Sequence, residues 1–202
     1  MDKTLLLKTT GGPLDVNTYA VCNGNDCILI DPGVPEQKVV SMIGKRNVMG
    51  VLLTHGHMDH IAGITPWIEK KIPIFCHPLD IPLLQNPDLN LSSKYASESI
   101  SVLGPVEKLY DKQVLQFNNI SCMFIHTAGH TPGSGCFYFA KEQWLLSGDT
   151  LFLQGCGRTD LPKGDPYDMA LSLQRLLSLP GDTRVYPGHG PETKIEWERN
   201  SY

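Results

Sequence analysis

Short apolar runs, separated by turns that contain Gly and Pro, recur along the whole chain. Several of these runs are continuously apolar or rich in β-branched residues, which is typical of buried strands. The pattern predicts strands over residues 18–22, 27–30, 50–53, 72–76, 120–125, 136–140, 144–146 and 184–186. The tetrad NGND at residues 23–26 predicts a hairpin turn between the first two of them.

Helical segments lie between several of these strands. Helix-like patterns, with Pro before the first segment and Pro-Gly after the last, predict helices over residues 36–45, 61–70, about 78–84 and 167–179. Strands and hairpins mixed with crossover helices indicate an α/β protein in which helices cover the outside of sheets. No linker divides the chain, so we expect one domain over residues 1–202.

The composition is that of a soluble globular protein, because 41% of the 202 residues are hydrophobic and 19% are charged. Seventeen basic and 21 acidic residues give a net charge of −4, whereas a protein that binds a nucleic-acid backbone should be more basic. No apolar run is long enough for a membrane span or for a secretory signal. The six cysteines form no C-x-x-C pair, so reduced thiols are expected. We therefore expect a cytoplasmic protein with no nucleic-acid or membrane partner.

Several predicted strands stop abruptly at a polar residue that can bind a metal ion. These strand ends carry Asp31, His55, His130, Asp149 and His189. In layered α/β proteins a rigid sheet edge fixes the geometry of a site while the loops beyond it stay accessible. The sequence therefore predicts a site at one edge of the sheets.

The densest group of ligands is the segment THGHMDH at residues 54–60. His55 and His57 are two positions apart on an extended segment, so their imidazoles project to the same side and can share one metal ion. Asp59 and His60 follow as the chain turns into the helix predicted from residue 61, and they would reach a second point nearby. Imidazole and carboxylate ligands suit Zn, Mn or Fe, and the lack of Cys ligands argues against a closed structural zinc site.

With its H-x-H-x-D-H motif, later His, Asp and final His in this order, the sequence resembles the metallo-β-lactamase superfamily. The resemblance implies a four-layer αβ/βα sandwich, in which two mixed sheets are flanked by helices and the site lies at one edge. It also implies two divalent metal ions, with Zn favoured over Fe or Mn. The implied ligands are His55, His57 and His130 for one ion and Asp59, His60 and His189 for the other, with Asp149 bridging.

Such a dinuclear centre predicts hydrolysis. Two metal ions can bind a water molecule, lower its pKa and present hydroxide to an ester, thioester, lactone or amide. No G-x-S-x-G elbow supplies a competing nucleophile. Asp59, besides serving as a ligand, is placed to orient or deprotonate the attacking water, which makes it the candidate catalytic residue.

The segment DTLFLQGCGR at residues 149–158 resembles glyoxalase II and its relatives, which hydrolyse hydroxyacyl thioesters such as S-lactoylglutathione. The resemblance implies that Arg158 binds a substrate carboxylate, although an ion pair with Asp160 or Asp165 is the alternative. Glyoxalase II proper has a C-terminal helical domain that completes its glutathione pocket, and this chain ends soon after His189. The short single-domain hydrolases of the family are therefore the nearer match.

Two other functions stay open. Persulfide dioxygenases share the GCGRTD segment of residues 155–160 and use one iron on two histidines and an aspartate, which match His55, His130 and Asp149. A non-catalytic metal-binding module is the second alternative, but it needs closed coordination, and seven ligands shared by two ions leave positions for water.

Three further polar residues have no ligand position in this scheme. Asp31 either orients one of the histidines or caps a turn, and His77 and His126 are expected to have supporting or structural roles.

Overall fold

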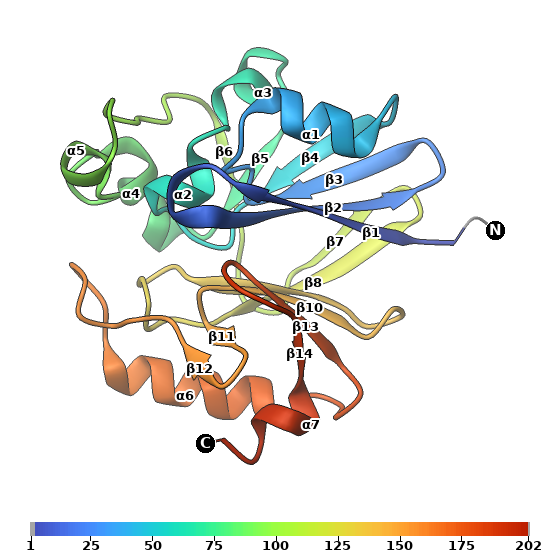
Figure 1. Cartoon of the computed structure of the whole chain (residues 1–202), viewed down its shortest axis with the longest axis vertical. Coiled ribbons are helices and arrows are strands. Elements are labelled where there is room, and N and C mark those ends of the chain that lie inside the picture. The colour runs from blue at the N-terminus through green and yellow to red at the C-terminus, as the bar shows by residue number, and fades with distance from the viewer. Residues whose placement is uncertain (1–2, 202) are drawn as a thin grey trace.

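The computed structural model describes residues 3–201, whose strands form two six-stranded sheets and a two-stranded ribbon (Figure 1). In spatial order, the first sheet consists of β1 (Leu5–Gly11), β2 (Val16–Asn23), β3 (Asp26–Ile30), β4 (Asn47–Leu52), β5 (Ile74–Cys76) and β6 (Val106–Lys108). The second consists of β14 (Thr193–Lys194), β13 (Arg184–Pro187), β10 (Trp144–Gly148), β9 (Gly135–Phe139), β8 (Ile120–His126) and β7 (Val114–Phe117). The ribbon pairs β11 (Leu151–Phe152) with β12 (Gly155–Cys156).

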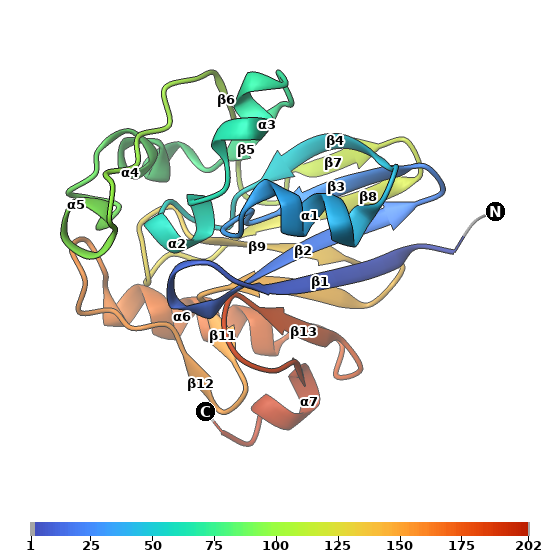
Figure 2. The same cartoon turned by 45° about the horizontal axis from the view of Figure 1, so that its top comes forward.

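Helices cover the outer face of each sheet. The first sheet is covered by α1 (Glu36–Ile43), α2 (Met58–Ile61) and α3 (Thr65–Glu69), and the second by α6 (Pro166–Leu177) and α7 (Ile195–Glu198) (Figure 1). Figure 2 shows α4 (Ile81–Gln85) and α5 (Ser92–Tyr95) beyond one end of the sheets, on the same side as α2. Two short 3-10 helices are η1 (Pro13–Asp15) and η2 (Pro78–Asp80). Within residues 3–201, no helix has the length and apolar character that a membrane crossing requires.

Three hydrophobic clusters fill the spaces between the four layers. One joins the first sheet to its helices and includes Leu29 and Trp67, and a second lies between the two sheets and includes Ile28 and Phe137. A third joins the second sheet to α6 and α7. Alternate residues of β3 belong to different clusters because successive side chains of a strand point to opposite faces. The expected four-layer αβ/βα sandwich of two mixed sheets is confirmed.

Strand direction brings the expected strand ends to one edge. β3 runs parallel to β4, and β10 runs parallel to β13. β8 and β10 are both antiparallel to β9 and so run in the same direction as each other. The segments that follow β3, β4, β8, β10 and β13 carry the polar residues singled out in the sequence.

All eight predicted strands are present, and the predicted helices over 36–45 and 167–179 correspond to α1 and α6. The helix predicted over 61–70 is wrong in detail, because α2 begins at Met58 and ends at Ile61, and a short non-helical segment separates it from α3. The backbone N–H of Gly63 donates to the carbonyl oxygen of Pro32 at 2.8 Å and not to a residue of the preceding turn, so the helical hydrogen bonds are interrupted there. The segment predicted at 78–84 is similarly divided between η2 and α4.

The sequence pattern did not predict six strands, β1, β6, β7, β11, β12 and β14, or the short helices α5 and α7. These elements are short or, like β1 at the edge of its sheet, partly exposed along both faces. Their apolar periodicity is correspondingly weak.

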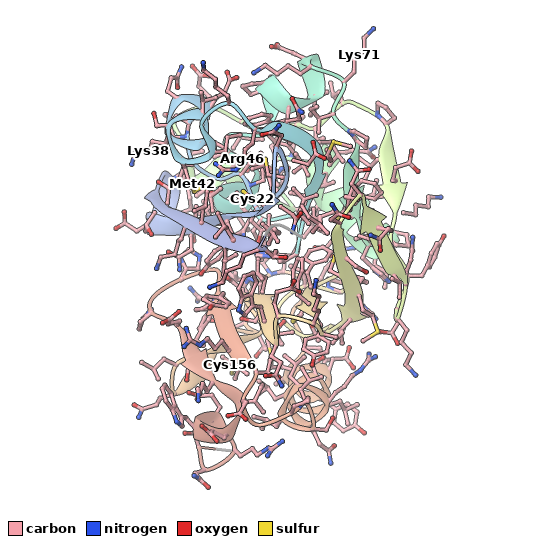
Figure 3. All side chains as sticks on the ribbon, turned by 90° about the vertical axis from the view of Figure 1, so that its right-hand side faces the viewer. Cys22, Lys38, Met42, Arg46, Lys71 and Cys156 are labelled. Atoms are coloured by element: carbon pink, nitrogen blue, oxygen red, sulfur yellow. The ribbon has the colours of Figure 1, made fainter. Side chains whose placement is uncertain are left out.

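The six cysteines, all within residues 3–201, are free thiols, and Cys156 is the one that is exposed. Figure 3 shows Cys22 and Cys156 in opposite halves of the molecule.

Candidate metal centre

A buried carboxylate anchors the start of the ligand segment. Asp31 follows β3 and accepts hydrogen bonds from the backbone N–H of Thr54 at 2.8 Å and from its hydroxyl at 2.6 Å. The Thr54 hydroxyl lies 3.1 Å from Nδ1 of His55. These hydrogen bonds therefore join the segments that follow β3 and β4, and Thr54 orients the His55 ring.

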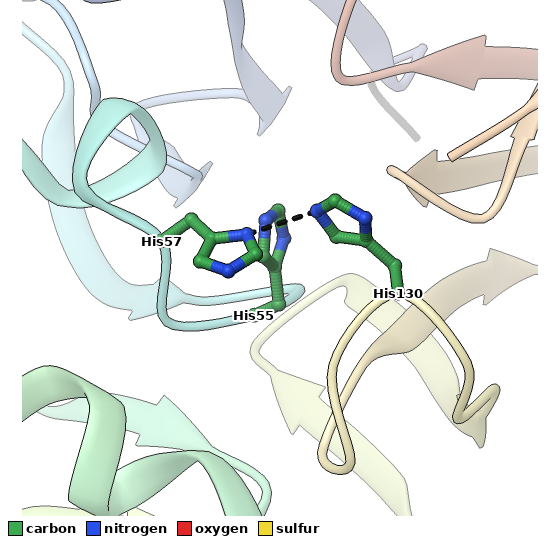
Figure 4. A group of neighbouring side chains, drawn as sticks. All are labelled: His55, His57 and His130. Carbon is green, nitrogen blue, oxygen red and sulfur yellow. Dashed lines mark hydrogen bonds between the residues drawn. The ribbon is translucent and has the colours of Figure 1, made fainter. Parts of the chain in front are cut away.

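The first ligand group consists of three imidazoles from two loops. His55 and His57 follow β4, and His130 follows β8 (Figure 4). One ligand atom from each lies within 4.8 Å of the others, and His57 Nδ1 is 2.9 Å from His130 Nε2. The backbone carbonyl of Arg158 lies 2.7 Å from Nδ1 of His130, which directs Nε2 of that ring toward the group.

The second ligand group consists of Asp59, His60 and His189, and it meets the same distance criterion. Asp59 and His60 lie in α2, contrary to the expectation that the helix starts after them. Nδ1 of His60 is 2.8 Å from Asp31, and Nδ1 of His189 is 3.1 Å from the carbonyl oxygen of Leu14. Both rings are therefore oriented through the nitrogen that faces away from the group, as is common for metal-binding histidines.

Asp149 lies between the two groups. Its Oδ1 is 3.3 Å from Nε2 of His60, and its Oδ2 is 3.6 Å from Nε2 of His130 and 3.7 Å from Nε2 of His189. A Cβ on Gly188 would lie 2.3 Å from Oδ1 of Asp149, so only glycine leaves room for this carboxylate. The structure thus brings all seven expected ligands together in one cluster, in which a third group, His55, His60 and Asp149, overlaps the other two.

The donor set fits metal ions. Among the described residues, six buried side-chain atoms lack a hydrogen-bond partner. Four of them belong to this cluster: Nε2 of His55, His57 and His60, and Oδ1 of Asp149. Buried polar atoms without partners are costly and rare in folded proteins. Their concentration here, with imidazole and carboxylate donors only, is what a site for divalent transition metals requires.

The protonation states of His55, His57 and Asp149 suit metal binding, whereas nearby carboxylates outweigh burial and raise the pKa of His60 and of His189. Burial, with contributions from the neighbouring histidines, lowers the pKa of His57 to about 3 and lowers the pKa of His55 as well. Burial alone would raise the pKa of Asp149, but the surrounding histidines, His60 first, outweigh it and hold that pKa below its ordinary value. At neutral pH the imidazoles of His55 and His57 are therefore neutral and the Asp149 carboxylate is charged, which are the forms that bind metal.

A cleft of about 550 Å³ opens onto the cluster. Among its lining residues, His57, Asp59, His130, Asp149 and His189 come from the ligand groups. Its apolar lining comes from Leu14, Met58, Leu91, Tyr95, Phe152 and Leu161. Such a cleft can bind an apolar part of a small molecule while the metal site faces its polar part.

Arg158 lines the cleft, but its guanidinium is already paired. Nε and one terminal nitrogen donate to the two oxygens of Asp160 at 2.6 and 2.7 Å, and both side chains are largely exposed. The ion pair with Asp160, one of the two alternatives drawn from the sequence, is therefore present at the edge of the cleft.

Other polar residues lie behind the ligands. The rings of His77 and His126 stack on each other with centroids 4.1 Å apart, and neither belongs to a ligand group. Asp80, which sequence reasoning did not single out, contacts the loops of both His57 and His130. Nothing local in the sequence distinguishes Asp80, because its partners are 24 to 53 positions away.

Comparison with known proteins places the chain among metal-dependent enzymes. The sequence matches the metallo-beta-lactamase superfamily over residues 11–189. A probable metallo-hydrolase of Streptococcus pyogenes serotype M6 is 34% identical over 204 residues, 97% of this chain and 88% of the relative. A hydroxyacylglutathione hydrolase of Aeromonas hydrophila is 33% identical over 173 residues, 85% of this chain and 59% of the relative.

Two solved structures share the fold over nearly their whole length. The BLEG-1 B3 metallo-beta-lactamase has a TM-score of 0.91 and 33% identity, with 97% of each chain covered. TTHA1623, solved in a di-iron-bound form, has a TM-score of 0.85 and 37% identity, with 96% of this chain and 97% of that chain covered. Together with the match over residues 11–189, these likenesses show that the chain belongs to the metallo-beta-lactamase superfamily.

Proposed function

We propose that this metal-dependent hydrolase is dinuclear and acts on a thioester, such as S-lactoylglutathione, or on a related acyl ester. The observation that carries the proposal is the position of Asp149, whose two oxygens face nitrogens of both ligand groups. A second complete group around His60 is what a dinuclear site needs, and a single-iron dioxygenase centre on His55, His130 and Asp149 would leave it unused.

The residues around the cleft have distinct tasks. The ligand groups would hold two divalent ions, which would supply an activated water and a Lewis acid for the substrate carbonyl. Asp59 lines the cleft with its Oδ2 3.0 Å from Nε2 of His189, so it can orient the attacking water and accept its proton. Apolar side chains such as Phe152 and Leu161 bind the acyl or thiol portion and exclude bulk water.

Support for a thioester comes from the relatives. The Aeromonas hydrophila protein is named a hydroxyacylglutathione hydrolase. The name of the Streptococcus pyogenes relative, a probable metallo-hydrolase, supports hydrolysis but indicates no particular substrate. The di-iron form of TTHA1623 makes iron as reasonable an occupant as zinc.

The test is hydrolysis by the metal-loaded protein of S-lactoylglutathione, an uncharged thioester, an activated ester and a lactone. Preferred turnover of a thioester, lost after chelation and restored by Zn²⁺ or Fe²⁺, is the expected result. Absence of turnover in a protein that holds two metal ions would contradict the proposal in favour of a binding module. Oxygen uptake with glutathione persulfide would contradict it in favour of the dioxygenase.

Arg158 gives a prediction about substrate charge. If the substrate is an anionic thioester, the Arg158→Ala variant should raise KM by about 10-fold, because a charged hydrogen-bond partner at the edge of the cleft is lost. An uncharged ester should be hardly affected. Steady-state kinetics on both substrates check this, and equal losses on both would mean that Arg158 holds only its loop.

Asp160→Asn is the matched variant. It removes the carboxylate that now occupies the guanidinium of Arg158. KM for the anionic thioester should therefore fall, since the substrate no longer displaces a charged partner. An unchanged or higher KM would show that the pair does not compete with substrate.

A further inference from the structure

Asp80 is a fully buried acid next to the first ligand group, on a segment that carries no ligand. It is the last residue of η2, which follows β5, and it has no exposed surface. No lysine or arginine forms an ion pair with it in the described part of the chain. Burying an acid without a cationic partner is costly, so hydrogen bonds to the carboxylate must compensate for its burial.

The carboxylate of Asp80 joins two separate loops. Its Oδ2 accepts from the backbone N–H of Gly56 at 2.8 Å and from the hydroxyl of Thr131 at 2.7 Å. Its Oδ1 accepts from the backbone N–H of Gly133 at 2.7 Å. Gly56 lies between His55 and His57, and Thr131 directly follows His130.

Neither loop can shift toward or away from Asp80 without losing these contacts. A Cβ on Gly133 would lie 2.6 Å from Oδ1 of Asp80, and a Cβ on Gly56 would lie 3.1 Å from its carbonyl oxygen. Both backbones therefore pack directly against this residue. One side chain fixes the separation of the loops from which all three imidazoles project.

The second ligand group has a different support. There the buried carboxylate of Asp31 contacts the ring of His60 itself. Asp80 touches no ligand ring and acts only through the backbone and Thr131. Loss of Asp80 should therefore be felt mainly at the first group, whereas Asp31 also accepts hydrogen bonds from Thr54, next to His55.

We propose that Asp80 is a positioning residue that holds the His55–His57 loop and the His130 loop at metal-binding separation. It thereby sets the metal affinity of the first ligand group. The inference rests on the metal site of the proposed function, but not on the substrate.

The central test is the Asp80→Asn variant. In either orientation, the side-chain amide turns N–H donors toward the backbone N–H of Gly56 or of Gly133, so one loop loses its support. We expect metal affinity at the first group to fall about 10- to 100-fold, in line with other residues that support metal ligands. A chelator titration should then remove one ion at low chelator concentration while the second stays bound.

Two measurements separate positioning from general destabilisation. Asp88→Asn removes an exposed carboxylate nearby and should leave both affinities unchanged. In the metal-free protein, the amide hydrogens of Gly56 and Gly133 should exchange faster in Asp80→Asn, while those of the β8 and β9 core strands should not.

Thr131→Val serves as a milder variant if Asp80→Asn does not fold, because it removes one hydroxyl donor and keeps the side-chain shape. It should weaken the first group alone, by a smaller factor. Unchanged affinities in a folded Asp80 or Thr131 variant, or equal weakening of both groups, would overturn the inference. A wild-type protein that binds two ions but hydrolyses nothing would refute the proposed function and leave this inference standing.

Discussion

The Asp149→Ala variant is expected to lose metal from both ligand groups and to hydrolyse substrate at least about 1,000-fold more slowly. Asp149 places one oxygen near His60 and the other near His130, so its removal takes a ligand atom from each group at once. It also removes one of the negative charges that lie among the histidines.

Elemental analysis and steady-state kinetics on the purified variant check this prediction. Asp88→Ala, which removes an exposed carboxylate, is the control and should keep both metal and activity. Retention of two ions and of the full rate by Asp149→Ala would show that this carboxylate does not bridge.

The His189→Ala variant should empty the second group and leave the first occupied. His189 reaches Asp59 at 3.0 Å but belongs to no group with His55 or His57. About one ion per chain should remain, and hydrolysis should slow by about 100-fold or more because Asp59 loses its partner and one ion is missing.

His130→Ala is the mirror variant, since it removes a ligand of the first group only. The two variants should therefore each keep one ion, but in environments that Co²⁺ absorption spectra distinguish. Identical spectra, or loss of both ions from His189→Ala, would contradict the division into two groups.

The candidate ligands could be recognised in the sequence because most of them follow predicted strands, and the resemblance to the family supplied their division between two ions. His55, His130 and Asp149 each follow an apolar run that the structure confirms as β4, β8 and β10. The contacts that orient the ligands were harder to predict from the sequence. Asp31 could be connected to the site only in general terms, and its contact with His60 depends on the parallel pairing of β3 with β4.

The role of Asp80 and the ion-pair partner of Arg158 could not be predicted from neighbouring residues in the sequence. Asp80 follows an ordinary Pro-Leu pair, and its role depends on loops that the fold brings together from distant positions. The sequence left two possible acids for Arg158, and only the geometry of the loop selects Asp160. Likewise, edge strand β1 carries too little apolar periodicity to be predicted, because both of its faces are partly exposed.

The proposed hydrolase holds two metal ions per chain in one cluster. The most direct test is the number of transition-metal ions per chain in the reconstituted protein after removal of loosely bound metal. We expect a value close to two, with both ions lost on adding a strong chelator. A value of one or less under saturating Zn²⁺, Fe²⁺ or Mn²⁺ would contradict it.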